Sequence, residues 1–339
     1  MTTEFIWQLP TSGDGRYSQA QRSRRGERAA PGHIPFTEGV SDPRGDRFNY
    51  FDYLHQVARA ADITGFDGVL VPHDLEGDES WIVAGYLARG TRHVRLIAGF
   101  DAGWGSAVYA AKNAVSFQRA TNGRFGWQIV AGAGADEATR RRHADNVPQQ
   151  DVLARIDEFV TVARGVQTSA PYDFKGRFFE VQGGGFRGPL GGNPLPPVYL
   201  GGTSEEALAL SARQADVHVF AAAPVEELRA PIARLRELAQ GRSLAIGLRI
   251  DVLAREDAAE AEREAALYLA QSGQERAGFE RGTLVGSYDE VEQRLAEYAE
   301  AGVTSFVLGA TPSLEEAWRF GEHVLPRLRA RLNQDRQAA

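Results

Sequence analysis

Short runs of apolar residues alternate with segments of helical periodicity along most of the chain. Within each run the apolar character is nearly continuous, as in parallel strands whose two faces are both buried. The predicted strands are Phe5–Pro10, Phe66–Pro72, Arg95–Phe100, Phe125–Gly132, Val198–Gly202, Val217–Ala222, Ile246–Leu253 and Ser305–Ala310. The predicted helices that follow them are Asn49–Gly65, Glu79–Arg89, Ala107–Ala120, Val152–Val166, Glu205–Gln214, Val225–Ala239, Asp257–Gln271 and Leu314–Leu332.

Eight strand–helix units in series predict a (β/α)₈ barrel, the TIM-barrel architecture. A doubly wound open sheet is the alternative, but the chain lacks a G-x-G-x-x-G turn after its first strand. At 339 residues the chain is long enough for one large barrel or for two ordinary domains. The pattern favours one barrel domain that spans residues 1–339.

Three segments exceed what a barrel requires. Gly13–Phe48 is polar and arginine-rich and lies between the first strand and the first helix. Pro171–Val181 is typical of a β-hairpin with a turn at Lys175-Gly176, and Gln182–Pro197 is a Gly/Pro-rich approach to the fifth strand. Because active sites of such barrels lie at the C-terminal strand ends, we expect Gly13–Phe48 on the catalytic face. Its length favours a function, and a surface loop without one is the alternative.

Composition says little about the fold but excludes several classes of partner and of catalytic chemistry. The net charge of −7 argues against a nucleic-acid partner, which needs a basic face. The absence of cysteine excludes disulfides, thiolate nucleophiles, cysteine zinc sites and iron–sulfur clusters. The histidines lack metal-ligand spacing, so no metal is expected, and G-x-S-x-G is absent. With no signal peptide and no membrane span in the sequence, we expect a soluble cytoplasmic protein.

A pair of glycines followed by two hydroxyl residues ends the fifth strand. Gly201, Gly202, Thr203 and Ser204 directly precede the helix that begins near Glu205. Glycines let the backbone approach an anion, and hydroxyls with free N–H groups at a helix start bind phosphate. In the alternative interpretation, Thr203 or Ser204 only caps the helix and Gly202 permits the turn.

Arg249 lies inside the seventh strand, in the segment IGLRIDVL. An arginine among apolar residues needs an anionic partner, because burying its charge unpaired is costly. That anion is either a group of the substrate or the carboxylate of Asp251, which strand alternation places on the same face.

Other polar residues follow or end neighbouring strands. Ser12 follows the first strand, and His73 with Asp74 follows the second, where the pair could serve as acid and base or form a polar loop. Asp101 ends the third strand and Gln128 lies inside the fourth. These two side chains could bind a heterocyclic ring by hydrogen bonds, or could satisfy one another.

Several longer segments, in order over almost the whole chain, match one known family. They are FIWQLPTSGDGRY, GFDGVLVP, DESWIVAG, AKNAVSFQRATNGR, FKGRFFEV, PPVYLGGTSEEALALSARQADVHV, IGLRIDVLARE and LVGSYDEVEQRLAEYAEAGVTSFVLGATPSLEEAWRFGEHVLP. The chain resembles the bacterial luciferase-like flavin monooxygenases, and within them the alkanesulfonate monooxygenase branch. The resemblance implies an enzyme that uses O₂ and reduced FMN from a separate NAD(P)H-dependent flavin reductase. In that branch an organosulfonate is cleaved at its carbon–sulfur bond to sulfite and an aldehyde, and dimers or tetramers are usual.

The resemblance also implies roles for individual residues. Gly201–Ser204 matches the family's phosphate-binding turn, and Gln128 falls where the family usually has asparagine beside the flavin ring. Arg249 matches a strand arginine associated with sulfonate binding and catalysis, and Arg281 roughly matches a second arginine in the mobile loop before the eighth strand. We therefore expect catalysis by Arg249, Arg281 and Asp251, flavin binding by Gln128, Asp101, Gly201, Gly202, Thr203 and Ser204, and substrate binding by Ser12, His73, Arg249 and Arg281.

Several positions depart from the family pattern. The family's histidine after the first strand is Ser12 here, and the cysteine of its second βα loop falls near Gly77. Its histidine after the strand arginine is Asp251, a tyrosine at the flavin phosphate is Leu153, and the tyrosine after the eighth strand is Thr311. The substrate pocket is therefore expected to be rebuilt. A flavin monooxygenase that hydroxylates or Baeyer–Villiger-oxidises a non-sulfonate stays open, as do a deazaflavin-dependent oxidoreductase and a flavin-binding protein without turnover.

Overall fold

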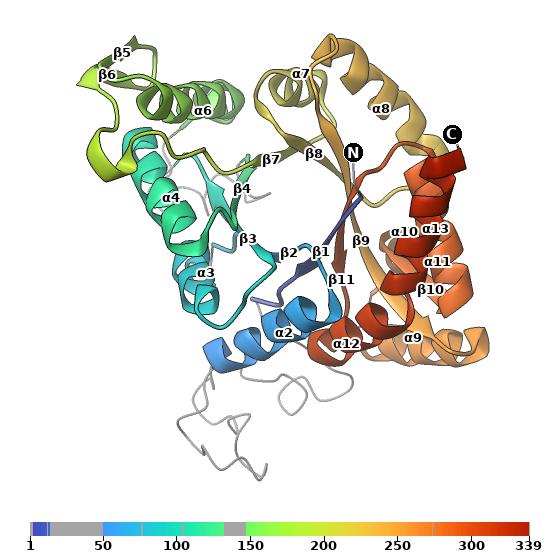
Figure 1. The fold of residues 1–339 in the computed structure, drawn as a ribbon. Helices are drawn as coiled ribbons and strands as arrows, with labels where there is room; N and C mark the ends of the chain where they lie inside the picture. Colours follow the sequence, from blue (N-terminus) through green and yellow to red (C-terminus); the bar gives the residue numbers. More distant parts are fainter. Residues whose placement is uncertain are drawn as a thin grey trace.

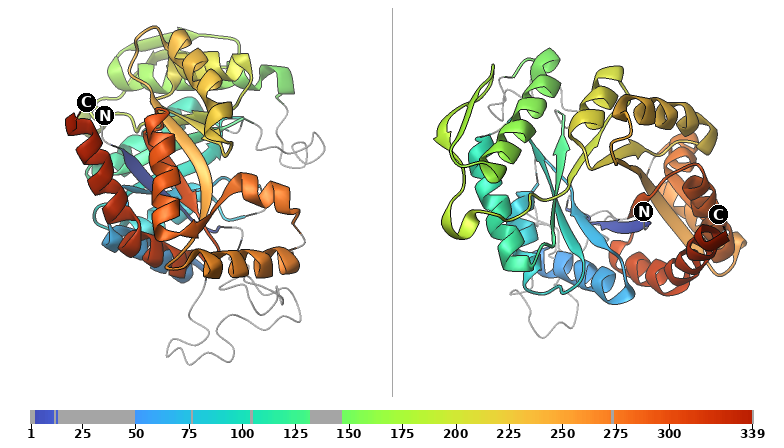
Figure 2. Two further views of the ribbon diagram at one scale, coloured as in Figure 1. Left: turned by 90° about the vertical axis from the view of Figure 1, so that its right-hand side faces the viewer. Right: turned by 45° about the horizontal axis from the view of Figure 1, so that its top comes forward.

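The computed structural model describes residues 3–11, 13, 50–75, 77–103, 105–131, 147–272 and 274–338. Eight parallel strands form a closed ring in the order β11-β1-β2-β3-β4-β7-β8-β9, with helices around it (Figures 1 and 2). The strands of the ring are β1 (Glu4–Gln8), β2 (Gly68–Val71), β3 (Arg95–Asp101), β4 (Phe125–Val130), β7 (Val198–Gly201), β8 (Val217–Ala221), β9 (Ala245–Arg255) and β11 (Ser305–Gly309). The predicted (β/α)₈ barrel is confirmed.

The eight predicted apolar runs coincide with these eight strands. The helices are α2 (Tyr50–Thr64), α3 (Ser80–Ala88), α4 (Ala107–Thr121), α6 (Val152–Thr168), α7 (Glu205–Gln214), α8 (Val225–Ala239), α9 (Ala258–Ser272), α10 (Arg276–Gly282), α11 (Tyr288–Glu300), α12 (Ser313–His323) and α13 (Leu325–Ala338). None of the helices in the described part of the chain is long and apolar enough to cross a membrane.

The segment before the last strand differs from the expected loop. It contains α10, strand β10 (Thr283–Ser287) and α11. Strand β9 is eleven residues long and continues past β11, so that β10 pairs with its last part, from Asp251 to Arg255. The strand was missed because its apolar run is too short to be told from a loop.

Two further boundaries differ from the prediction. The hairpin pairs β5 (Tyr172–Lys175) with β6 (Glu180–Gly184), and its connection is residues 176–179 rather than a two-residue turn. The last predicted helix is two helices, α12 and α13, separated at Val324. Pro326 lacks the N–H that would continue α12, and it is tolerated in the first turn of a new helix. Of the expected loop Gly13–Phe48, all but Gly13 lies outside the described residues.

The barrel has an apolar interior and an apolar outer surface. Alternate strand residues, including Ile6 and Ile97, pack inside the ring. Their chain neighbours Trp7 and Leu96 are fully buried and belong to the larger core shared with the helices. Because both faces of each strand are buried, the strands appear in the sequence as continuous apolar runs.

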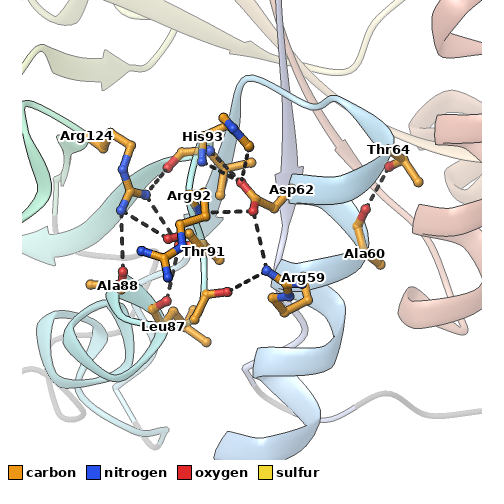
Figure 3. Close-up of polar contacts among 12 residues, drawn as sticks. Arg59, Ala60, Asp62, Thr64, Leu87, Ala88, Thr91, Arg92, His93 and Arg124 are labelled. Atoms are coloured by element: carbon orange, nitrogen blue, oxygen red, sulfur yellow. Dashed lines mark hydrogen bonds and ion pairs between the residues drawn. The ribbon is translucent and has the colours of Figure 1, made fainter.

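A carboxylate on α2 organises the connection into β3. The buried Asp62 accepts hydrogen bonds from the backbone N–H groups of Arg92, His93 and Val94, at 2.7 to 3.0 Å (Figure 3). Burial would raise the pKa of Asp62, but the three N–H donors outweigh it and hold the pKa below its ordinary value. The α3–β3 connection is thereby attached to α2.

A polar network closes the N-terminal end of the barrel. The hydroxyl of the buried Tyr199 lies 2.9 Å from Glu4 Oε1 and 3.1 Å from Arg95 Nη1. Arg95 Nη1 donates directly to Glu4 Oε1 at 2.5 Å, and Ser305 Oγ donates to the same carboxylate. Burial and the neighbouring Glu4 carboxylate raise the pKa of Tyr199, so its phenol stays protonated.

Replacing Tyr199 with phenylalanine removes the hydroxyl between these charged groups. We expect Tyr199→Phe to lower the free energy of unfolding by about 1–3 kcal/mol, because the half-buried charges of Glu4 and Arg95 each lose one hydrogen bond. Urea denaturation measures this loss. Tyr109→Phe, at a side chain that is 65% exposed, is the control and should be near neutral; equal losses in both variants would contradict the role of the network.

A buried histidine should make stability depend on pH. His218 on β8 and Ser211 on α7 are fully buried, with 2.7 Å between Nδ1 and Oγ. Burial lowers the pKa of His218 to about 4. The unfolded chain binds that proton near pH 6.5, so above this pH His218 takes nothing from the free energy of unfolding. Below it, the free energy of unfolding decreases as the pH falls toward 4, by about 3 kcal/mol in all.

His218→Asn retains a short polar group near Ser211 but does not titrate. Unfolding free energies measured at pH 7 and near pH 4.5 should therefore fall less in the variant than in the native chain. The same decrease in both proteins would show that another group carries the pH dependence.

Candidate functional site

A cavity of about 410 Å³ lies at the C-terminal ends of β1, β9 and β11. One side is formed by the strand ends, and the other by residues of α9 and α10. The C-terminal end is where (β/α)₈ barrels place their active sites. The cavity is therefore the candidate site.

Arg249 and Asp251 lie side by side in the middle of β9, level with the C-terminal end of β11. They are two residues apart on β9 and so project from the same face. Arg249 donates from Nη1 to Asp251 Oδ1 at 2.9 Å and from Nε to Gln8 Oε1 at 2.5 Å. All three residues line the cavity. Of the two anions considered for Arg249, the structure supplies Asp251.

The absence of a side chain at residue 309 allows this arrangement. Gly309 on β11 is the register partner of Asp251. A Cβ atom there would lie 2.6 Å from Asp251 Oδ1 and 3.0 Å from Arg249 Nη2. Both distances are shorter than ordinary van der Waals contact, so a larger residue at this position would push the ends of the two side chains aside.

The predicted phosphate turn leads from β7 into α7. Gly202 has a φ of +123°, and a Cβ on it would lie 2.8 Å from Ala207 Cβ. Ser204 caps α7, because its Oγ accepts a hydrogen bond from Ala207 N at 3.2 Å. Residues 201–204 are exposed, so the first N–H groups of α7 are accessible to an anion. The turn thus serves as a helix cap, and its binding of a phosphate stays a prediction.

The polar strand residues Gln128 and Asp101 are oriented by alternation. Gln128 shares a face with Gly126, where a Cβ would contact Ile97 and Tyr199 of the inner core, so it faces the barrel interior. Asp101 is buried, and its Oδ1 accepts a hydrogen bond from Gly103 N at 2.7 Å.

Asp101 and His73 line a second cavity of about 420 Å³, beside the first turns of α3 and α4. Pro72 lines the first cavity. The two predicted substrate residues His73 and Arg249 therefore belong to different cavities, which approach each other at residues 72 and 73.

The second predicted arginine lies elsewhere. Arg281 on α10 forms an ion pair with Glu227 on α8, with 3.2 Å between Nη1 and Oε1, and its side chain is 53% exposed. It is not among the described residues that line the first cavity. Its catalytic and substrate roles stay predictions. Ser12 lies outside the described residues, and its role is a prediction too.

Three residues of the cavity were not anticipated. Gln8 lies in an apolar segment, where only its alternation with Trp7 could have indicated an inward position. Tyr268 on α9 and Phe279 on α10 pack with 5.4 Å between ring centroids, and both line the cavity. Nothing in the local sequence marks this aromatic pair, because its place depends on how the insert folds.

Comparisons with known proteins agree with this architecture. A sequence profile described as luciferase-like monooxygenase matches residues 4–305. The structure is similar to EDTA monooxygenase from Chelativorans sp. BNC1, with a TM-score of 0.78, 16% identity and coverage of 98% of this chain and 94% of that one. It is also similar to the Pseudomonas putida 3,6-diketocamphane monooxygenase in complex with FMN, with a TM-score of 0.69, 15% identity and coverage of 96% and 99%.

A third similar structure uses another cofactor. The F420-dependent secondary alcohol dehydrogenase matches with a TM-score of 0.70, 16% identity and coverage of 96% of this chain and 98% of that one. At such identities these likenesses concern the fold alone.

Adding one methyl group at Gly309 should disturb the charged pair. We expect Gly309→Ala to lower the free energy of unfolding by up to about 1 kcal/mol, because the new methyl group pushes the ends of Arg249 and Asp251 apart and weakens their ion pair. Gly278→Ala is the matched control: it lines the same cavity, has open space around its Cβ and lies in α10, where alanine favours the helix. The control should be neutral or stabilising in chemical denaturation.

The cost of Gly309→Ala should also shrink in an Asp251→Ala background, where the obstructing oxygen is absent. An undiminished cost there would place the strain on the backbone instead of on the charged pair.

Proposed function

We propose that this chain, which belongs to the luciferase-like monooxygenase family, is a reduced-FMN-dependent monooxygenase. In this proposal it uses O₂ to oxygenate a small organic molecule in the cavity at Arg249. Reduced FMN comes from a separate NAD(P)H-dependent flavin reductase. The observation that carries the proposal is that an anion-accepting turn and a lined cavity share the C-terminal end of one barrel.

The residues at the barrel mouth fit a flavin. The turn at residues 201–204 would hold its phosphate at the start of α7, where Gly202 lets the backbone approach an anion. Gln128 and Asp101 would hydrogen-bond the ring from β4 and β3. When bound, reduced flavin supplies the two electrons that convert one atom of O₂ to water while the other enters the substrate.

The chain's own part is to orient the substrate and to exclude water. Leu9, Leu253 and Phe279 form apolar parts of the cavity wall, and such a wall limits the access of water to the reaction. Arg249 offers N–H donors on a strand of the barrel, a rigid element. Its orientation is set by Gln8 and Asp251.

The geometry favours a substrate that is not a sulfonate. A sulfonate clamp would use the fork of Arg249, but Nε and Nη1 already donate to Gln8 and Asp251. Arg281, the second expected clamp residue, pairs with Glu227. We therefore place hydroxylation or Baeyer–Villiger oxygenation of a non-sulfonate first. Cleavage of an organosulfonate to sulfite and an aldehyde is the second candidate, supported by the position of Arg249 in the cavity.

The proposal is tested by aerobic incubation with FMN, a flavin reductase and NADH. Mass spectrometry after reaction under labelled dioxygen should detect one labelled atom in the organic product, and no sulfite should be released from a panel of sulfonates. Release of sulfite would instead establish the second candidate. Absence of labelled product together with tight binding of reduced coenzyme F420 would overturn the flavin assignment in favour of a deazaflavin.

The phosphate turn can be tested separately by binding. Gly202→Ala adds a Cβ at a positive φ, against Ala207 and beside the anion site, and should weaken anaerobic binding of reduced FMN about tenfold or more. Gly241→Ala also adds a Cβ at a positive φ, but in open space beyond α8. Both variants should lose stability because of the positive φ, Gly202→Ala somewhat more through its contact with Ala207, whereas only Gly202→Ala should lose affinity for FMN. Equal FMN affinity in the two would remove the turn from the flavin site.

A further inference from the structure

Each charged side chain in the described lining of the first cavity has a partner of opposite charge. Among the described residues that line it, the charged ones are Arg249, Asp251 and Glu264. Arg249 is paired with Asp251, and the Glu264 carboxylate is hydrogen-bonded to the buried guanidinium of Arg255. The lining therefore presents one positive and two negative groups. An anionic ligand would gain one contact with Arg249 and meet the negative charge of Asp251 beside it.

The charged pair offers a donor and an acceptor next to each other. Arg249 and Asp251 are 30% and 42% exposed, although each has its partner within the pair. Both Arg249 Nη2 and Asp251 Oδ1 border the space above Gly309, at 3.0 and 2.6 Å from the point where a Cβ would lie. Within the described chain, no hydrogen bond occupies Arg249 Nη2 or Asp251 Oδ2. Guanidinium nitrogens only donate and carboxylate oxygens only accept.

Only a ligand that both accepts and donates hydrogen bonds can satisfy Arg249 Nη2 and Asp251 Oδ2 together. A sulfonate or carboxylate offers acceptors alone, so it would leave Asp251 facing oxygen. An ammonium group offers donors alone, so it would leave Arg249 facing N–H groups. A carbonyl beside an N–H supplies one acceptor and one donor and carries no net charge.

The opposite wall is suited to an apolar body. Tyr268 and Phe279 form an aromatic pair on α9 and α10. Burial and the charge of Asp251 raise the pKa of Tyr268, so its phenol stays neutral beside the charged pair. Leu9 and Leu253 complete apolar parts of the lining. A flat ring can pack on such aromatic side chains.

We propose that the cavity binds neutral molecules with a carbonyl beside an N–H, such as lactams, cyclic ureas and related nitrogen heterocycles. The carbonyl accepts from Arg249, the N–H donates to Asp251, and the ring packs against Tyr268 and Phe279. This assignment rests on the proposed function in one respect: it names the substrate class of the same site.

Four probes that share a bicyclic ring system test hydrogen bonding to the Arg249–Asp251 pair, by isothermal titration calorimetry on the full chain. They are the lactam carbostyril, its N-methyl derivative, its lactone isostere coumarin, and naphthalene sulfonate, each titrated with and without FMN. Carbostyril should bind about tenfold tighter than each of the other three, because each of them leaves the free donor of Arg249 or the free acceptor of Asp251 unmet or opposed. Equal or tighter binding of the sulfonate, or binding of none of the four, would overturn the assignment.

Asp251→Asn tests the charge balance directly. It keeps the side-chain shape and an acceptor oxygen but removes the charge that neutralises Arg249. Affinity for naphthalene sulfonate should rise about tenfold in the variant, while affinity for carbostyril should fall about tenfold, because the amide NH₂ replaces the oxygen that accepts from the lactam N–H. Asp289→Asn, in an exposed ion pair with Arg327, removes the same charge from the surface and should change neither. No gain of sulfonate affinity in Asp251→Asn contradicts the proposal.

These titrations separate the substrate class from the enzyme class. A preference for carbostyril without any incorporation of oxygen would support the cavity assignment and contradict the monooxygenase proposal. Oxygenation of sulfonates but not of lactams would support the monooxygenase proposal and contradict the cavity assignment.

Discussion

The pairing of β9 with both β8 and β11 is the constraint on which the rest of the structure depends. It closes the ring of parallel strands, so the barrel has no free sheet edge and alternate side chains must point inward. Because β9 continues beyond β11 to pair with β10, the strand that closes the barrel also joins the insert to it. The cavity exists where these two roles of β9 meet.

The candidate site has two ends with different chemistry. At the β7–α7 turn, exposed backbone N–H groups and a glycine with positive φ suit an anion such as the flavin phosphate. On the other side of β8, Arg249 is already neutralised by Asp251 and oriented by Gln8. One barrel mouth can therefore bind a charged cofactor at one end and a neutral substrate at the other.

Much of the barrel could be predicted because burial of both strand faces leaves a local mark in the sequence. Each of the eight strands appears as an apolar run, and the turn before α7 appears as two glycines and two hydroxyls. Strand β10 leaves no such mark, since Thr283–Ser287 is short and its pairing depends on the extension of β9. Tyr268 and Phe279 could not be assigned to the cavity for the same reason.

The sequence by itself determined the eight strands of the ring and their order along the chain. It also determined that Arg249 and Asp251 share a face, because a strand repeats every two residues. Only the tertiary structure decided what these residues contact. It brings Gln8 to Arg249 across 241 positions of sequence, places Gly309 beneath the pair and pairs Arg281 with Glu227 on another helix. Such contacts follow from ring closure and from the packing of the insert, which depend on the whole chain rather than on any local pattern.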